Sequence, residues 1–359
     1  MVGIRTLAGT ALIAGVGGIV GNNLARHLLA EGWTVHGLAR RPPSDIPGLQ
    51  PVAADLTDPA TLATLRDLRS SHVFITAWLR QATEADNIRV NGAMVRNLLD
   101  AVRPDGGVRH VALVTGLKHY LGPFETYGQG SLPATPFREE QPRLDVENFY
   151  YAQEDSVFAA AERDGFSWTV HRPHTIIGYA LGNAMNMGVT LAVYASLCRE
   201  TGRPFRFPGS DAQWNGLTDM TDARLLARHL AWAATAPAAR NLAFNVVDGD
   251  IFRWSWMWGR LANWFGLEAQ PFDGTVRPLE EQMAEDGPRW AEVAHRHGLV
   301  EADLGRLASA WHTDADLGRP IEVVTDMSRS RKLGFLEYQA TDEAFFDLFD
   351  RLRGDKVIP

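Results

Sequence analysis

The sequence predicts an α/β protein in which helices cover both faces of a parallel sheet. Short, almost continuously apolar runs alternate with helical patterns through about the first half of the 359 residues. Strands buried on both faces have this composition, and the intervening helices allow parallel connections. A glycine-rich turn follows the first apolar run, as is typical of nucleotide-binding sheets. These features indicate a Rossmann-type, doubly wound sheet.

Six strands are predicted in this part of the chain, each a short run rich in apolar and β-branched residues. They cover residues 10–15, 34–39, 51–56, 72–78, 110–116 and 168–173. Helical patterns between them predict helices over residues 19–31, 59–69, 83–103 and 147–163.

Beyond residue 178 this alternation ends, and helical patterns dominate. Helices are expected within 220–235, 254–266 and 278–312, with a late strand near NVVDG at 245–249. We therefore expect residues 1–180 to form a dinucleotide-binding domain to which later segments return. Residues 181–359 are expected to form mainly a smaller, mostly helical, substrate-binding lobe. Trp254, Trp256 and Trp258 are assigned to packing.

Composition excludes several classes of partner. The formal net charge of −8, without a basic tract, argues against nucleic-acid binding. No run approaches the roughly 20 apolar residues that a membrane span needs. The single cysteine, Cys198, suits a reducing compartment, and glycines interrupt the apolar N-terminal stretch, so secretion is disfavoured. We expect a cytoplasmic protein.

Metal catalysis is also disfavoured. The chain has no H-E-x-x-H and no C-x-x-C motif. The close pair His295 and His297 has no evident third ligand, and we interpret it as a solvated helix end.

The stretch AGVGGIVGNNLARHLL places Gly15, Gly18 and Gly21 at G-x-x-G-x-x-G spacing, between the first strand and the first helix. Glycines there let the backbone turn tightly and approach a pyrophosphate, which binds free N–H groups at the helix start. A flexible turn is the alternative, but the position after the first strand favours dinucleotide binding. The same loop adds Gly17, Ile19 and Val20 as cofactor-binding candidates.

The end of the second strand indicates NADPH. Enzymes that prefer NAD usually end this strand with an acid that binds the ribose hydroxyls. Here the strand runs into GLARRPP, and the first acid, Asp45, comes too late. Arg40 and Arg41 instead offer guanidinium groups suited to a 2′-phosphate. A solvated surface pair is the alternative, but it does not explain the missing acid.

Residues at the ends of the other strands are expected to line the cofactor. Asp55 and Leu56 would flank the adenine, and the backbone at Thr76 and Ala77 would pass the ribose. Core packing is the simpler interpretation of Trp78, which we also keep as a cofactor and substrate candidate. The remaining cofactor-binding candidates are Thr115, Gly116, Pro173 and Ile176.

The helix predicted over 147–163 contains two adjacent tyrosines, in ENFYYAQED. Short-chain dehydrogenases usually place Tyr and Lys four residues apart, as Y-x-x-x-K. The residues four positions after Tyr150 and Tyr151 are acidic, so the usual lysine is absent. Lys118 ends the fifth apolar run, where a charge is costly unless it has a task. We therefore expect Lys118 to reach across the crevice toward Tyr150.

At these motifs the chain resembles the progesterone 5β-reductase/iridoid synthase-like enzymes, an atypical branch of the extended short-chain dehydrogenases. TGLKHYLGPFETYG and NFYYAQED carry the resemblance, which extends from GVGGIVGN and GLARRP through HRPHTIIG and FNVVDGDIFRW to KVIP. It implies NADPH-dependent 1,4-reduction of α,β-unsaturated carbonyls, including steroid, terpenoid or small enones. It also implies that Tyr150 and Lys118 are the catalytic pair and that Phe124 lines the substrate pocket.

Some positions depart from the family pattern. Gly17 replaces a usual threonine, which should leave phosphate binding intact. His174 and Thr175 stand where Gly-Asn is usual, and His312 stands where an aromatic residue commonly covers the substrate. These changes bear on the substrate more than on the reaction. Asn186, between two methionines, is a further substrate candidate, with core packing as an equal alternative.

The expected chemistry follows from charge development. Hydride addition to the β-carbon of an enone leaves negative charge on the carbonyl oxygen, as an enolate. A phenol hydrogen bond aimed at that oxygen stabilises the transition state more than the ground state. Lys118 would tune Tyr150 as a donor or hold its charge, because an ammonium favours ionised tyrosine. Core packing is the alternative interpretation of Tyr150.

Two other functions share the fold. A sugar-nucleotide epimerase or dehydratase would ordinarily keep Y-x-x-x-K and prefer NAD. A non-catalytic NADPH-sensing protein would have no reason for a pair formed by Lys118 and Tyr150. The sequence thus favours an enone reductase with a small apolar substrate. The natural substrate, the face of hydride delivery and the oligomeric state stay open, a homodimer being one candidate.

Overall fold

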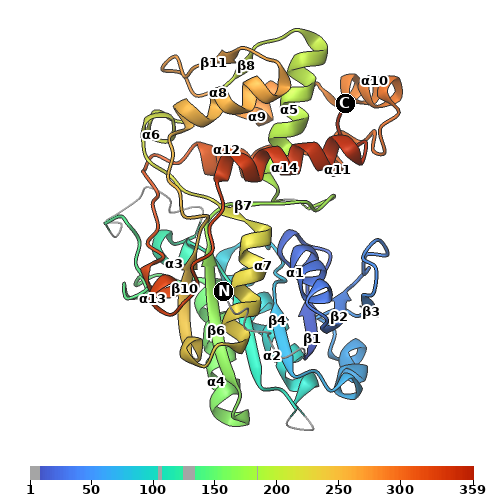
Figure 1. Ribbon diagram of the computed structural model, residues 1–359, viewed down its shortest axis with the longest axis vertical. Helices are drawn as coiled ribbons and strands as arrows, with labels where there is room; N and C mark the ends of the chain where they lie inside the picture. Colours follow the sequence, from blue (N-terminus) through green and yellow to red (C-terminus); the bar gives the residue numbers. More distant parts are fainter. Residues whose placement is uncertain (1–8, 104–106, 124–133, 184) are drawn as a thin grey trace.

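The computed structural model describes residues 9–103, 107–123, 134–183 and 185–359. A sheet flanked by helices forms one lobe, and a mostly helical second lobe lies beside it (Figure 1). Seven strands, all parallel, form the sheet in the order β10-β6-β5-β4-β1-β2-β3. The chain moves outward from β1 to β3 and then crosses to β4 on the other side of β1. The predicted doubly wound α/β fold is confirmed.

The sheet contains all six predicted strands and the late one. They are β1 (Thr10–Ala14), β2 (Thr34–Ala39), β3 (Gln50–Ala53), β4 (His72–Ile75), β5 (His110–Val114), β6 (Ser167–Pro173) and β10 (Leu242–Val246). The helices of this lobe are α1 (Ile19–Ala30), η1 (Pro59–Leu68), α2 (Glu84–Val102), α3 (Lys118–Leu121), α4 (Phe149–Asp164), α7 (Ala223–Thr235), η3 (Pro237–Ala239) and α13 (Ser328–Lys332). The element expected over 59–69 is a 3₁₀ helix rather than an α-helix.

Side chains alternate across the sheet and build a core on each face. Ala11 and Ile13 of β1 pack in a cluster with α1 and α7, whereas Leu12 and Ala14 pack in a cluster with η1, α2 and α4. Successive strand residues point to opposite faces, so a strand covered on both sides must be apolar throughout. This accounts for the continuous apolar runs that identified the strands.

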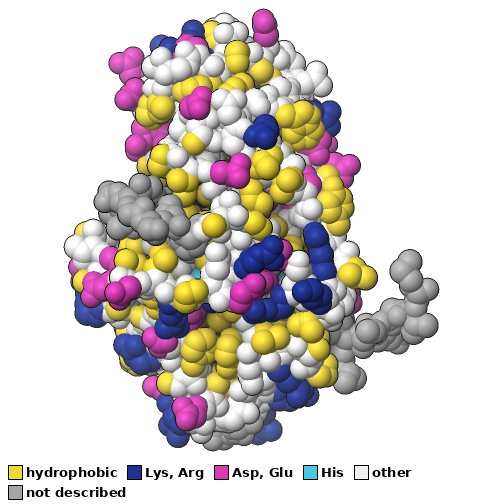
Figure 2. Space-filling view, turned by 90° about the vertical axis from the view of Figure 1, so that its left-hand side faces the viewer, with side chains coloured by type: hydrophobic (Ala, Val, Ile, Leu, Met, Phe, Trp, Pro, Cys, Tyr) yellow, Lys and Arg dark blue, Asp and Glu magenta, His cyan; other side chains and the backbone are white. Residues whose placement is uncertain are grey.

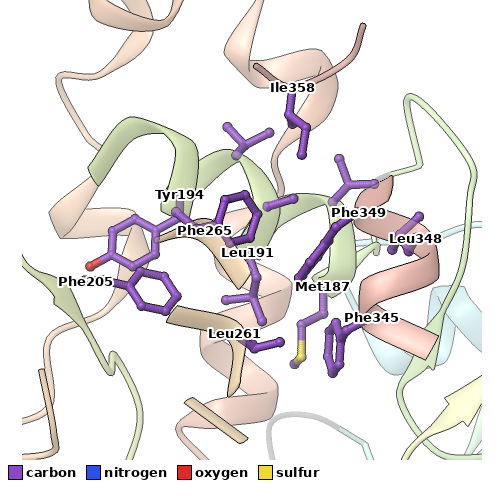
Figure 3. Packing of buried hydrophobic residues seen from close by; sticks show 14 of the residues in the cluster. Met187, Leu191, Tyr194, Phe205, Leu261, Phe265, Phe345, Leu348, Phe349 and Ile358 are labelled. Carbon is purple, nitrogen blue, oxygen red and sulfur yellow. The ribbon is translucent and has the colours of Figure 1, made fainter. Parts of the chain in front are cut away.

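The second lobe has its own core, centred on α5 (Met187–Thr201). Figure 3 shows side chains from α5, α8 (Trp254–Phe265) and α14 (Thr341–Gly354) converging on one apolar cluster. The other elements of this lobe are β8 (Phe205–Arg206), α6 (Asp211–Asn215), β11 (Ala269–Gln270), α9 (Leu279–Gln282), α10 (Gly287–His297), α11 (Leu304–Leu307) and α12 (Ala310–Leu317).

The three alternating tryptophans of α8 differ in burial. Trp254 and Trp258 are buried, as predicted, but the prediction for Trp256 is wrong, because 49% of that residue is exposed. Residues two positions apart on a helix point to nearly opposite sides, so Trp256 faces away from the core that holds its neighbours.

The chain passes between the lobes several times. β7 (Ile176–Ile177) pairs with β9 (Thr221–Asp222), and α7, β10 and α13 return to the sheet lobe from beyond residue 220. Acidic and basic side chains are interspersed over the face shown in Figure 2. Within the described ranges, no helix has the length and apolar character needed to cross a membrane.

Candidate active site

A cavity of about 990 Å³ opens at the carboxyl ends of the parallel strands. Its walls come from the segments that follow β1 to β6, together with residues of α12 in the second lobe. The strand order changes direction between β1 and β4, and ligands of open α/β sheets bind at such a switch point. The fold thus brings loops from distant parts of the sequence to one crevice.

Most of the residues singled out in the sequence lie in this cavity. From the cofactor, catalytic and substrate candidates, the lining includes Gly15, Gly17, Gly18, Ile19, Val20, Arg40, Arg41, Asp55, Leu56, Thr76, Ala77, Trp78, Thr115, Gly116, Lys118, Tyr150, Pro173, Ile176 and His312. Phe124 lies outside the described residues.

Two candidates lie elsewhere and have structural contacts instead. A Cβ on Gly21 would lie 2.3 Å from the Gly15 carbonyl oxygen, so this glycine lets α1 pack against the loop. Asn186 caps α5, because its Oδ1 accepts from the Val189 N–H at 3.1 Å. Its Nδ2 donates to the Gly178 and Ala180 carbonyls at 3.0 and 3.1 Å. Close packing thus explains Gly21 and capping explains Asn186, and neither residue is part of the cavity lining.

The glycine-rich loop leaves backbone donors facing the cavity. Gly15 has a φ of +96°, and a Cβ there would lie 2.8 Å from the Ala77 nitrogen, so only glycine fits. A Cβ on Gly17 would meet no described atom within 4 Å. Helix α1 starts after Gly18, without a capping side chain among the described residues. Its first N–H groups therefore remain available to an anion.

The loops after β2 and β3 present opposite charges at the cavity. Arg40 and Arg41 are exposed. Asp55 is turned toward its own loop, because its Oδ1 accepts from the Thr57 N–H at 2.9 Å and the Thr57 hydroxyl at 2.7 Å. These hydrogen bonds, with a smaller contribution from the Arg40 charge, lower the pKa of Asp55. Arg40 and Arg41 thus add two exposed guanidinium groups to the cavity lining.

Tyr150 is held at the start of α4 by a buried asparagine. The Asn148 Oδ1 accepts from the Tyr150 N–H at 3.0 Å, and its Nδ2 donates to the Lys118 carbonyl at 2.7 Å. One amide thus connects the backbones of the two catalytic candidates. Glu84 of α2 accepts from the Phe149 N–H at 2.7 Å and fixes the same turn. A Cβ on Gly116 would lie 3.3 Å from the Tyr150 hydroxyl, which places that hydroxyl beside the loop after β5.

Lys118 lies beyond the end of its strand. β5 ends at Val114, and Lys118 begins the short helix α3. The residue is buried, and its Nζ lies 5.1 Å from the centroid of the Phe149 ring. Phe149 in turn packs on Tyr150, with ring centroids 4.4 Å apart. The two candidate side chains therefore line one cavity and share an aromatic neighbour.

The environment of Tyr150 keeps its hydroxyl protonated. Burial raises the pKa of Tyr150 above its ordinary value of about 10, and the Glu84 carboxylate raises it further. Of the two roles expected for this side chain, a neutral hydrogen-bond donor or a charged phenolate, the environment favours the donor.

Several lining residues were not identified from the sequence. Arg80 stacks its guanidinium 3.9 Å from the centroid of the Trp311 ring, between the loop after β4 and α12. Asp316 and Arg319 join His312 in the wall. His312 and Asp316 lie four residues apart on α12, a spacing visible in WHTDADLGR, whereas Arg319 follows the end of this helix at Leu317.

The described residues also account for the close histidine pair. His295 and His297 are exposed at the end of α10, as predicted. His297 Nε2 lies 3.1 Å from a carboxylate oxygen of Glu200. In the described parts of the chain, no cluster of three or more His, Cys, Asp or Glu side chains has an arrangement that could hold a metal ion.

Comparison with known proteins places this chain among reductase relatives. Residues 58–359 match the family model described as a PRISE-like Rossmann-fold domain. An (S)-8-oxocitronellyl enol synthase of Camptotheca acuminata is 38% identical over 99% of this chain and 94% of its own length. A 3-oxo-Δ(4,5)-steroid 5-β-reductase of Arabidopsis thaliana is also 38% identical, with the same coverage. The resemblance inferred from the motifs is confirmed.

Solved structures show the same fold at lower identity. A UDP-glucose 4-epimerase of Thermotoga maritima aligns with a TM-score of 0.67 at 15% identity, over 96% of this chain and 99% of that one. An epimerase of Methanothermobacter thermautotrophicus aligns with a TM-score of 0.70 at 15% identity, over 98% of this chain and 94% of that one. At this identity, the likeness concerns the fold alone.

Proposed function

Since this chain belongs to the family of PRISE-like Rossmann-fold proteins, we propose that it is an NADPH-dependent reductase of the C=C bond of α,β-unsaturated carbonyl compounds. One observation carries the proposal. Tyr150 and Lys118, 32 positions apart in the sequence, line one cavity, and the Asn148 amide connects their backbones.

The residues at the sheet edge suit a dinucleotide phosphate. The free N–H groups at the start of α1 would hold the pyrophosphate, since Gly15 and Gly17 keep side chains out of its path. Arg40 and Arg41 would bind the 2′-phosphate, because no acid ends β2 to bind a free ribose hydroxyl. When bound, NADPH supplies the hydride.

The chain's own contribution is to stabilise the developing negative charge. The neutral Tyr150 hydroxyl would donate to the carbonyl oxygen of the enone, where charge accumulates as the C=C bond is reduced. The buried Lys118 ammonium would add a positive charge in the same low-dielectric cavity. The enolate can then take a proton at its α-carbon from water, so no second acid is required.

A sugar-nucleotide epimerase is the less favoured alternative. The position four residues after Tyr150 is held by Glu154, where that class would carry lysine. Glu154 is buried, and it pairs with Arg143 at 2.8 Å and with Arg172 at 3.5 Å. A carboxyl side chain cannot supply the positive charge of the missing lysine, and the carboxylate of Glu154 is already occupied by two structural ion pairs.

Loss of NADPH absorbance in the presence of 2-cyclohexen-1-one tests the proposal. We expect NADPH to be consumed, NADH to be consumed much more slowly, and a UDP-sugar incubated with NAD to be unchanged when its epimers are separated by chromatography, since epimerisation consumes no cofactor. Turnover of the UDP-sugar alone would contradict the proposal and favour the epimerase. Binding of NADPH without turnover of any enone would favour a non-catalytic sensor.

A further inference from the structure

Resting on the proposed function, we propose that the substrate is an α,β-unsaturated carbonyl compound that carries a carboxylate at its far end, and that Arg80 binds this carboxylate. Arg80 belongs to the loop after β4 and lines the cavity. The proposal adds a charged group to the substrate class, since Tyr150 and Lys118 serve only the reacting end of the molecule.

Two buried asparagines of α2 hold the loop on either side of Arg80. Asn91 donates from Nδ2 to the Leu79 carbonyl at 2.9 Å, and its Oδ1 accepts from the Leu79 N–H at 2.8 Å. Oδ1 of Asn87 accepts from the Gln81 N–H, also at 2.8 Å. Neither asparagine is more than 8% exposed. The backbone that carries the Arg80 side chain is therefore fixed, which lowers the entropic cost of binding a ligand there.

Ring contacts place this loop beside the catalytic candidates. The Trp78 ring stacks on the Phe149 ring, with centroids 5.4 Å apart and an angle of 19° between the ring planes. Phe149 also packs on Tyr150, with centroids 4.4 Å apart, and the Lys118 Nζ lies 5.1 Å from the centroid of the same phenylalanine ring. Arg80 follows Trp78 by two residues, so their Cα atoms lie at most about 7 Å apart. One short molecule can therefore present a carbonyl to Tyr150 and an anion to Arg80.

The guanidinium of Arg80 is oriented and can be reached from the cavity. It packs on the ring of Trp311, on the α12 side of the cavity, with Cζ 3.9 Å from the ring centroid. Cation–π attraction orients the group, and the N–H donors at the edge of a stacked guanidinium stay available to a planar carboxylate. Arg80 and Trp311 both line the cavity, and Arg80 is exposed, so a ligand can contact these donors.

The cavity wall does not neutralise the Arg80 charge. Among the described residues, the Arg80 guanidinium has no ion pair, and its partner is the Trp311 ring. The acids in the described part of the lining are Asp55 and Asp316. Asp55 is bonded within its own loop, and Asp316 lies 3.2 Å from the buried Arg319. A carboxylate on the ligand would supply the anion that these residues do not.

The cofactor phosphates are expected at another part of the cavity. The strand order is β5-β4-β1-β2, so Arg80 follows a strand on one side of β1, whereas Arg40 and Arg41 follow β2 on the other side. The pyrophosphate is expected at the start of α1, directly after β1. Arg80 lies on the side of β1 that also holds β5 and Lys118, where the substrate carbonyl is expected. A carboxylate of the substrate, rather than a phosphate of the cofactor, is therefore the anion assigned to Arg80.

Three series of linear 2-alkenals test this proposal, with one to six methylene groups between the C=C bond and a terminal carboxylate, methyl ester or trimethylammonium group. At low ionic strength we expect a chain length at which the carboxylate compound has a kcat/KM about tenfold above its methyl ester, the value of one charge-assisted hydrogen bond. The trimethylammonium compound should be the poorest substrate. Potassium chloride at about 0.5 M should reduce the carboxylate preference, because salt screens an exposed ion pair.

Variants of Arg80 assign the preference to this side chain. Arg80→Gln should abolish the carboxylate preference, measured as a ratio within each variant, and should leave unchanged the Kd of NADPH, measured by its fluorescence on binding. Arg80→Glu should invert the preference, so that the trimethylammonium compound becomes the best of the three. Arg89→Gln, the same change at an arginine of α2 whose side chain is 71% exposed, should keep the preference for the carboxylate.

The outcomes separate this proposal from the proposed function. Equal kcat/KM for carboxylate and ester at every length, or a preference that survives Arg80→Gln, would overturn the proposal while leaving the reductase intact. An equal loss with all three series in Arg80→Gln would show a contact that only joins the lobes, and a weaker Kd for NADPH would show a cofactor ligand; either result would overturn the proposal. Should Arg80→Gln not fold, a carboxylate preference that salt does not reduce would count against Arg80. Failure of every alkenal to consume NADPH would overturn the proposed function itself.

Discussion

Lowering the pH from 7.5 to 5.5 should destabilise this protein by several kcal/mol, because a group of four neighbouring histidines is buried in neutral form; His119, buried elsewhere with a lowered pKa, acts in the same direction. The four are His72, His110, His171 and His229, none more than 5% exposed. The Thr169 hydroxyl forms hydrogen bonds with His110 at 3.0 Å and with His171 at 2.9 Å. His171 also forms a hydrogen bond with His229 at 3.0 Å. Burial is the main cause of each shift, and it lowers the pKa of His72 to about 4, of His110 and His229 to about 3, and of His171 well below its ordinary range.

The sign and size of the effect follow from linkage. At pH 7.5 both the folded and the unfolded chain hold these histidines neutral. Below a pH of about 6.5 the unfolded chain binds protons at these histidines and the folded chain does not. The free energy of unfolding therefore decreases as the pH is lowered. Between pH 7.5 and 5.5 each histidine contributes about 1.3 kcal/mol to this fall, so four contribute about 5 kcal/mol. That loss is comparable to the whole stability of many domains.

Urea unfolding at a series of pH values measures the effect. We expect the urea concentration at the unfolding midpoint to fall toward pH 5.5. The change of the free energy of unfolding with pH should correspond to several protons taken up on unfolding. His229→Gln removes one titrating group from this cluster and should reduce the slope by about one proton, whatever its effect on stability at pH 7.5. A free energy of unfolding that is unchanged between pH 7.5 and 5.5 would refute the assignment of these histidines as buried and neutral.

Three substitutions at the candidate site give further predictions. Tyr150→Phe should lower kcat about 10²- to 10³-fold, as loss of an oxyanion donor does, with KM for NADPH little changed in steady-state assays; unchanged kcat would remove Tyr150 from the chemistry. Replacing both Arg40 and Arg41 with serine should weaken NADPH binding roughly 10- to 100-fold relative to NADH, because a charge-assisted contact to the 2′-phosphate is lost; an unchanged ratio of the two Kd values would contradict this. Asn148→Ala should cost about 1 kcal/mol of stability, because the cap of α4 is lost. It should also lower kcat, because the link between Tyr150 and the Lys118 carbonyl is removed. A fall in Tm with full kcat would show that the role of this asparagine is structural only.

The strands could be predicted from the sequence because burial on both faces leaves a continuous apolar run. Their ends could not, and the strands expected to reach residues 78 and 116 stop at Ile75 and Val114. Beyond Ile75, the Thr76 hydroxyl turns to the Ala14 carbonyl at 2.9 Å. The Thr76 N–H donates to the same carbonyl at 2.9 Å, and the strand ends with this contact although the composition stays apolar. Residues 76–78 and 115–116, which were expected to extend the two strands, line the cavity instead.

The two halves of the site also differ in how far the sequence predicts them. The nucleotide-binding half is encoded locally, since Gly15 must follow β1 and the arginines must follow β2. The polar wall depends on contacts between distant segments, such as that of His174 with Arg319, 145 positions apart. His174 and His312 were noticed as unusual. The partner of His174 was missed because no local pattern connects that residue with Arg319, whereas Asp316 was missed although it follows His312 by four residues.

Reduction of 2-cyclohexen-1-one with NADPH deuterated at the transferable position of its nicotinamide ring follows the hydride directly. We predict cyclohexanone with deuterium on the carbon that was β to the carbonyl, a product that is lost in the Tyr150→Phe variant. An allylic alcohol with deuterium on the former carbonyl carbon would contradict this, because the hydride would have reached the C=O group instead of the C=C bond.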